Sequence, residues 1–103
     1  MKSILSPGEG CCFFCGGNGT SDPLDKHHVF GGPFRQKSKR YGLTVRLCHL
    51  RCHEYGPEAV HRSARRDREL KAFAQAEAMN YYGWSVSDFV SRFGKNYLDM
   101  EVF

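Results

Sequence analysis

The sequence predicts a small α+β domain in which a β-hairpin and a short helix precede two C-terminal helices. Three observations indicate this class: two short apolar runs on either side of a basic segment, cysteines spaced as two pairs, and two later stretches with helical periodicity. With 103 residues, the chain has room for one domain with a modest core. We expect a flexible arm over 1–10, where no periodic pattern occurs, and a single domain over 11–103.

The hairpin is predicted from its side-chain pattern. Apolar and polar residues alternate over 43–47, which is the clearest strand, and Val29 and Phe30 favour a shorter strand over 26–30. A Gly-Gly-Pro sequence ends this first strand. The segment between the strands, 34–42, is rich in Lys and Arg and is expected to be a long basic loop.

Three helices follow the hairpin in this prediction. The first is short, from His49 to about residue 55, and a Gly-Pro sequence ends it. The second is expected to begin at residue 57 or 58 and to continue to Tyr82. Ser85 and Asp88 resemble a capping box at the start of the third, and a glycine ends it after an apolar stripe of Phe and Val.

The basic charge is concentrated in one part of the chain. From Lys26 to Lys71 there are twelve Lys and Arg against four Asp and Glu, whereas the rest has three basic residues against seven acidic ones. Such a distribution is typical of a surface that binds a polyphosphate. For any single Lys or Arg, an ordinary solvated helix face is the alternative interpretation.

The composition also indicates where the chain works. No apolar run approaches the roughly 18 residues that a membrane span requires. The N-terminal residues lack the apolar stretch of a secretory signal, so we expect a cytoplasmic protein with reduced thiols. In that compartment, five cysteines are better explained as metal ligands than as disulfides.

The cysteines predict a zinc site with four thiolates. Cys12 and Cys15 form a C-x2-C closed by glycine, which is the usual form of a zinc knuckle, and Cys48 and Cys52 supply a second pair. Cys11 is left over. A buried structural cysteine or a redox pair is the alternative for C-x2-C alone, but no βαβ pattern surrounds it.

The histidines predict a second centre beside the first. His27 and His28 form a doublet before the Gly-Gly turn, and His49 and His53 are four residues apart. In a helix, residues four apart lie on one side, so this segment would present two thiols in one direction and two imidazoles in another. A neutral imidazole binds a metal or accepts a proton near neutral pH.

These residues resemble the small phage and prophage HNH nucleases, whose fold is a ββα-metal finger. The resemblance is seen in the sequence segments HHVFGG, SKRYGLTVRLC, AVH and FGKNYL and extends from about residue 12 to 98. The two cysteine pairs match those that flank the finger in zinc-containing members. The second pair there is usually C-x2-C, whereas here it is C-x3-C.

The resemblance implies a role for each histidine. His28 matches the general base that activates water, and His27 and His53 match ligands of a catalytic divalent ion, Mg²⁺, Mn²⁺ or another. His49 with His53 reproduces the spacing of a metal-binding pair in nuclease colicins, and His61 is a further candidate ligand. Zn²⁺ would be structural, and double-stranded DNA would be the substrate, with a phage protein as a further partner.

One position departs from the family pattern. The family has a middle Asn or His, and no Asn lies between Gly31 and Leu47. Either activity is incomplete or another polar group, such as Ser38, takes that role. We therefore expect a DNA-nicking endonuclease of low sequence specificity, the alternative being an inactive zinc module that binds nucleic acid or a protein partner. The side chains expected to contact nucleic acid are Arg35, Lys37, Lys39, Arg40, Arg62, Arg65 and Arg66.

Overall fold

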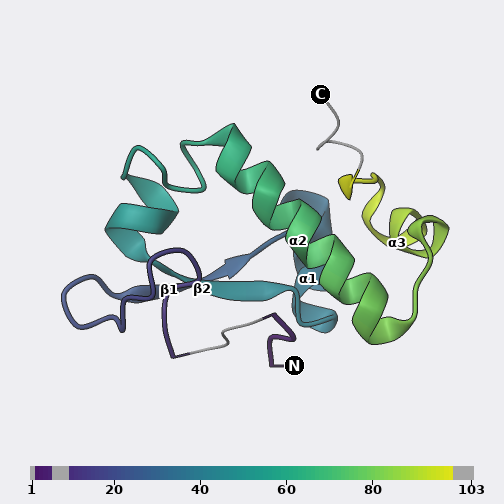
Figure 1. Ribbon diagram of the computed structural model, residues 1–103, viewed down its shortest axis with the longest axis horizontal. Coiled ribbons are helices and arrows are strands. Elements are labelled where there is room, and N and C mark those ends of the chain that lie inside the picture. Colours follow the sequence, from purple (N-terminus) through teal and green to yellow (C-terminus); the bar gives the residue numbers. More distant parts are fainter. Residues whose placement is uncertain (1, 6–9, 99–103) are drawn as a thin grey trace.

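The computed structural model describes residues 2–5 and 10–98, and within them the chain has the predicted α+β class. Its two strands form one antiparallel sheet. The elements in order are β1 (Leu24–His28), η1 (Gly32–Phe34), α1 (Arg35–Arg40), β2 (Thr44–Cys48), η2 (His49–Glu54), α2 (Ala64–Tyr82) and α3 (Val86–Phe93) (Figure 1). Among the described helices, none combines the length and apolar character that crossing a bilayer requires.

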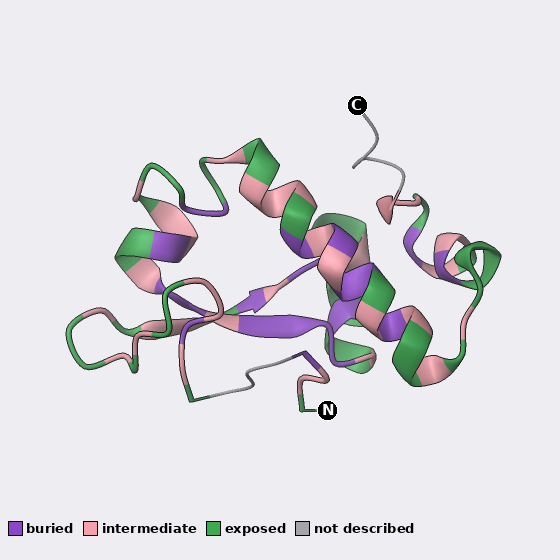
Figure 2. Cartoon of the chain, viewed as in Figure 1, coloured by how far each residue is buried: buried purple, intermediate pink, exposed green. Residues whose placement is uncertain are grey.

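The hairpin register places Cys48, the last residue of β2, and His28, the last residue of β1, at opposite ends of the sheet. Leu24 pairs with Cys48, and His28 pairs with Thr44. β2 is buried along most of its length (Figure 2). The long helix α2 runs across the hairpin (Figure 1), and its buried face joins Val45 and Leu47 of β2 in one hydrophobic core.

The expectation of a basic loop over 34–42 is wrong, because this segment is mostly the short helix α1. Its Arg, Gln and Lys residues are good helix formers, and Gly42, with a φ of +74°, follows its end. Ser38 is fully buried on α1, and its Oγ accepts a hydrogen bond from the N–H of Phe30 at 2.8 Å. β1 begins and ends two residues earlier than expected, at Leu24 and His28, and this bond ties the N–H of Phe30 to α1 instead of to β2.

The helices after the hairpin also differ in part from expectation. The short helix is present as η2, a wide helical turn in which the N–H groups of Tyr55 and Gly56 both donate to the carbonyl of Leu50. α2 begins at Ala64 rather than at residue 57 or 58. Ser63 is its N-cap, and the hydroxyl of Ser63 accepts a hydrogen bond from the N–H of Arg66. The capping box predicted for α3 is confirmed.

The two ends of the described chain pack on this frame. Within the expected arm, Ile4 donates to the carbonyl of Gly42 at 2.9 Å and Leu5 is buried, whereas residues 6–9 lie outside the described residues. At the other end, Phe93 of α3 packs on Phe30 with 4.8 Å between ring centroids. The aromatic core thus fixes α3 beside the segment that follows the histidine doublet.

Candidate metal centres

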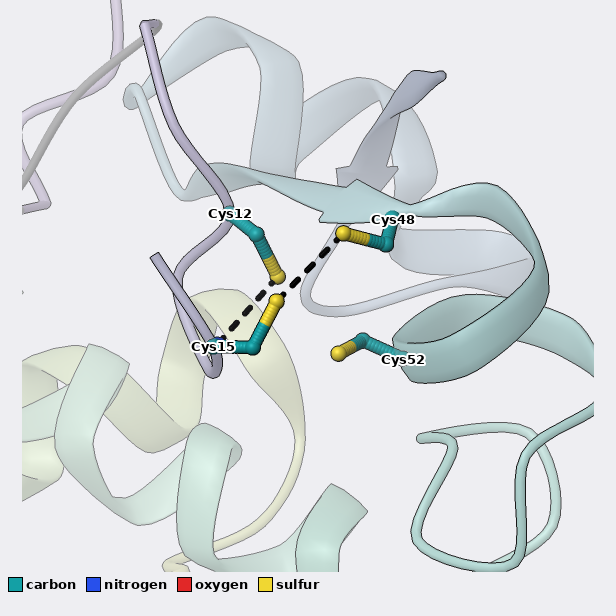
Figure 3. A group of neighbouring side chains, drawn as sticks. All are labelled: Cys12, Cys15, Cys48 and Cys52. Carbon is teal, nitrogen blue, oxygen red and sulfur yellow. Dashed lines mark hydrogen bonds between the residues drawn. The ribbon is translucent and has the colours of Figure 1, made fainter. Parts of the chain in front are cut away.

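The four predicted cysteines meet at one point. The Sγ atoms of Cys12, Cys15, Cys48 and Cys52 all lie within 4.8 Å of one another, and those of Cys15 and Cys48 are 3.4 Å apart (Figure 3). Tetrahedral zinc with bonds of about 2.3 Å needs sulfur atoms about 3.8 Å apart. The cluster therefore fits a four-thiolate zinc ion with little movement, and Cys11 lies outside it.

The first cysteine pair has the backbone of a zinc knuckle. The N–H of Cys15 points at the sulfur of Cys12 at 3.5 Å, and the N–H of Gly17 points at the sulfur of Cys15 at 3.4 Å. A Cβ atom on Gly17 would lie 3.2 Å from the sulfur of Cys48. Glycine is thus what lets the turn approach the second pair so closely.

The thiols differ in how readily they ionise. Burial raises the pKa of Cys12, but hydrogen bonds led by the N–H of Cys15 outweigh it and bring that pKa to about 7. Burial, together with the neighbouring sulfurs, raises the pKa of Cys48 to about 12 and raises that of Cys52 as well. Four thiolates cannot share so small a volume by themselves, so ionisation of all four thiols would require a cation between them.

Three histidines from separate elements form a second cluster. His27 comes from β1, His53 from η2, and His61 from the turn before α2, and one ring nitrogen of each lies within 4.8 Å of the others. The Nε2 atoms of His53 and His61 are 3.1 Å apart. The structure thus brings His61 to the pair that the family resemblance implied, and it leaves His49 outside this cluster.

His27 is built to stay neutral. It is 7% exposed, and its Nε2 is buried without a hydrogen-bond partner among the described residues. Burial, followed by the nearby charges of His53 and His61, lowers its pKa to about 3. An unpaired buried nitrogen with a free lone pair costs folding free energy, which a metal–nitrogen bond would offset.

His49 instead belongs to a group around the carboxylate of Asp25, a residue that was not predicted from the sequence. Its Nδ1 lies 2.6 Å from Oδ2 of Asp25, and Nδ1 of His53 lies 2.8 Å from the same oxygen. Burial raises the pKa of Asp25, but these two hydrogen bonds outweigh it, and the pKa falls below its usual value. The period of two along a strand could have revealed Asp25, because it shares a face of β1 with His27.

The histidine cluster opens into a cavity of about 720 Å³ that His28 also lines. Arg35 and Arg62, two of the predicted nucleic-acid contacts, line it as well, together with Lys26 and Lys71, which were not predicted. Burial, then the charges of Arg35, Lys26 and Lys39, lowers the pKa of His28 below its usual value. His28 is therefore neutral near pH 7 and beside concentrated positive charge.

Lys39 lines a second, smaller cavity that adjoins the first. Its volume is about 250 Å³, and it shares Lys26, His28 and Arg35 with the larger one. None of the described side chains lining this smaller cavity is acidic. The two cavities form one mainly basic surface, which we call the cation trough: Lys26, Arg35, Lys39, Arg62 and Lys71. Asp67 also lines the larger cavity and forms an ion pair with Lys71 at 2.8 Å.

The other four predicted contacts are not brought to the cation trough. Lys37 donates to the carbonyl of Arg92 at 2.8 Å, and the guanidinium of Arg40 lies over a tyrosine ring. Arg65 forms ion pairs with two glutamates, and Arg66 lies over a phenylalanine ring at 4.2 Å. These side chains contact the protein itself, as the solvated-face interpretation allows.

Comparisons of the chain with protein-family models, with curated proteins and with solved structures found no match. The function is therefore argued from the two candidate centres themselves.

Proposed function

We propose that this protein is a metal-dependent endonuclease of the HNH type that nicks DNA with low intrinsic sequence specificity. The observation that carries the proposal is the cluster of His27, His53 and His61, whose ligand nitrogens lie within 4.8 Å of one another beside His28. A metal site and a neutral base in one basic cavity are the parts that phosphodiester hydrolysis requires.

The donor set bears on the choice of ion. Three imidazoles suit ions such as Ni²⁺ or Zn²⁺ better than Mg²⁺ or Mn²⁺, which prefer oxygen ligands. His27, His53 and His61 would hold the ion, leaving positions for oxygen ligands. Bound there, the ion would stabilise negative charge on the phosphate and the leaving 3′ oxygen.

His28 is the proposed general base. Because its pKa is lowered by burial and by the cations around it, its imidazole can accept a proton from water at neutral pH. It follows His27 directly in β1, so the base and the first metal ligand are held by the same strand end. Water between His28 and the substrate phosphate would attack in line with the leaving oxygen.

The cation trough is the proposed phosphate-binding surface. Arg35 and Arg62 line the cavity beside the histidines. The guanidinium of Arg35 can bind non-bridging phosphate oxygens in a bidentate manner, whereas one nitrogen of Arg62 already donates to the carbonyl of Tyr55 at 3.0 Å and leaves the other for phosphate. Lys26 and Lys39 extend positive charge along the smaller cavity, where a neighbouring phosphate would lie. Contacts to phosphates alone carry little sequence information, in agreement with low specificity.

Ser38 is proposed to replace the middle Asn or His of the family. It is 0% exposed, and its hydroxyl accepts from Phe30 N–H at 2.8 Å, which fixes the segment immediately after His28. Its own carbonyl accepts from the N–H of Leu43 at 2.8 Å, next to β2. Ser38 thereby holds both strand ends of the finger in place, which is what the missing residue would have to do.

The absence of a middle Asn or His also favours a second candidate, a zinc module that binds nucleic acid or a protein without cleaving. The cysteine cluster by itself would serve such a module equally well. The two candidates differ in whether the histidine cluster supports turnover.

A plasmid-nicking assay separates them. Supercoiled DNA is incubated with wild type, His28→Ala and His27→Ala, in Mn²⁺, Ni²⁺, Mg²⁺ or chelator. We expect metal-dependent nicking that falls by about 10²–10⁴-fold in His28→Ala. Lys37→Ala and Arg35→Gln form a matched pair on α1, and only the second should weaken DNA binding. Full activity in His28→Ala would refute the assigned base, and salt-dependent binding without nicking by wild type would favour the binding module.

A further inference from the structure

We propose that Asp25 is a positioning residue for the histidine metal site: its carboxylate fixes the tautomer and ring orientation of His53, so that the other ring nitrogen is presented to the ion. The inference rests on the metal site proposed above. It also assigns His49 to the carboxylate rather than to the metal.

The hydrogen-bond geometry determines which nitrogen of His53 carries the proton. Nδ1 of His53 lies 2.8 Å from Oδ2 of Asp25, and an ionised carboxylate can only accept hydrogen bonds. The proton must therefore be on Nδ1. In the neutral ring, Nε2 then has a free lone pair, and this is the atom that lies 3.1 Å from Nε2 of His61 within the cluster.

The carboxylate is itself held in place. Nδ1 of His49 lies 2.6 Å from the same Oδ2 of Asp25, and the side chain of His49 is 43% exposed whereas that of His53 is 13% exposed. The outer histidine thus steadies the carboxylate, and the inner one reaches the cluster. Glu54 is a second acceptor near Nδ1 of His53, but at 3.3 Å it is farther than Asp25.

Main-chain hydrogen bonds make this arrangement rigid. The carboxylate of Asp22 accepts from the N–H groups of Leu50 and Arg51 at 2.9 and 3.0 Å, and His49 N–H donates to Pro23 O at 2.8 Å. They fasten η2 to the segment that leads into β1. Metal-bound histidines commonly donate their other N–H to a carboxylate, which sets the tautomer and strengthens the ligand.

The test measures metal affinity and tautomer without any DNA. Zinc-loaded full-length protein is titrated with Ni²⁺ by calorimetry as wild type, Asp25→Ala, Asp25→Asn and His49→Ala. We expect Asp25→Ala to lower the Ni²⁺ affinity by about 10–100-fold. Asp25→Asn should retain most of the affinity, because its amide oxygen still accepts from Nδ1–H, and His49→Ala, which removes only the outer hydrogen bond to the carboxylate, should lower the affinity less than Asp25→Ala does.

A second readout separates positioning from simple support of the fold. In wild type that carries zinc at the cysteine cluster but no ion at the histidine cluster, side-chain ¹⁵N NMR should find His53 protonated on Nδ1, and Asp25→Ala should shift it towards the Nε2-protonated form. Wild-type His53 protonated on Nε2 would overturn the inference even if Asp25→Ala failed to fold. Unchanged Ni²⁺ affinity in folded Asp25→Ala would overturn the inference alone, whereas wild type that binds no Ni²⁺ would also refute the proposed metal site.

Discussion

Two adjacent cysteines provide the sharpest test of the thiolate centre. Cys12 is 1% exposed and belongs to the sulfur cluster, whereas Cys11, its neighbour in the chain, lies outside it. Cys12→Ala and Cys11→Ala remove the same atom from consecutive positions. Any difference between them therefore reports on the cluster and not on the general loss of a thiol.

The expected size of the effect follows from the geometry. The sulfur atoms already lie within 4.8 Å of one another, so zinc binding needs little rearrangement and most of its free energy stabilises the folded state. A structural zinc contributes apparent free energies of about 10–16 kcal/mol, compared with about 5–15 kcal/mol for the whole stability of a typical domain. Loss of zinc from Cys12→Ala should therefore abolish cooperative folding, whereas Cys11→Ala should change stability by about 0.5 kcal/mol or less.

Zinc content by elemental analysis and thermal unfolding by circular dichroism measure the two quantities. We expect one zinc per chain in wild type and in Cys11→Ala, almost none in Cys12→Ala, and loss of the unfolding transition when a strong chelator is added. A Cys12→Ala protein that keeps its zinc and melts like wild type would refute the assignment of this ligand. Wild type purified without zinc, yet folded, would refute the whole centre.

Three further predictions concern single positions. Gly17→Ala puts a Cβ 3.2 Å from Cys48 Sγ and should weaken zinc binding by about 1–3 kcal/mol, measured by chelator competition; unchanged affinity would show that the turn can move aside. Ser38→Ala leaves a buried N–H unpaired and should cost about 1–3 kcal/mol in urea unfolding, with Ser38→Thr as the variant that keeps the hydroxyl. The pKa of His28 is lowered by burial and then by the charge of Arg35. The nicking rate should therefore fall, as pH decreases, only below pH 6.5, the usual pKa of histidine, and in Arg35→Gln this fall should begin at higher pH. An unchanged pH profile in Arg35→Gln would contradict the effect of Arg35 on His28.

The features that the sequence predicted well are those encoded over a few residues. The C-x2-C turn of Cys12 and Cys15 depends on its own backbone and on Gly17, and the box at Ser85 depends on residues three apart. Such patterns are complete in the sequence. The apolar alternation over 43–47 is of the same kind, and β2 forms within one residue of it.

The features that the sequence left open, such as the role of His61 as a further candidate ligand, or that were missed, such as α1, depend on contacts between distant segments. His61 reaches the cluster because Val60 N–H and His61 N–H donate to the carbonyls of Cys52 and His53, which folds the segment before α2 back onto η2. No local pattern in the sequence predicts that this segment folds back onto η2. α1 was missed because its residues are nearly all charged or polar. Its buried residue is a serine, Ser38, so the sequence shows no apolar stripe that would indicate a helix.

The turn η2 carries neighbouring residues that serve different centres. Cys52 points into the sulfur cluster, and His53, the next residue, belongs to the imidazole cluster. The distance between the two centres is therefore set by the single peptide bond that joins Cys52 and His53. Inserting or deleting one residue there would rotate Cys52 or His53 away from the other ligands of its cluster. Oxidation of the thiols would disturb the same peptide unit, so we predict that the proposed nicking activity requires reduced thiols.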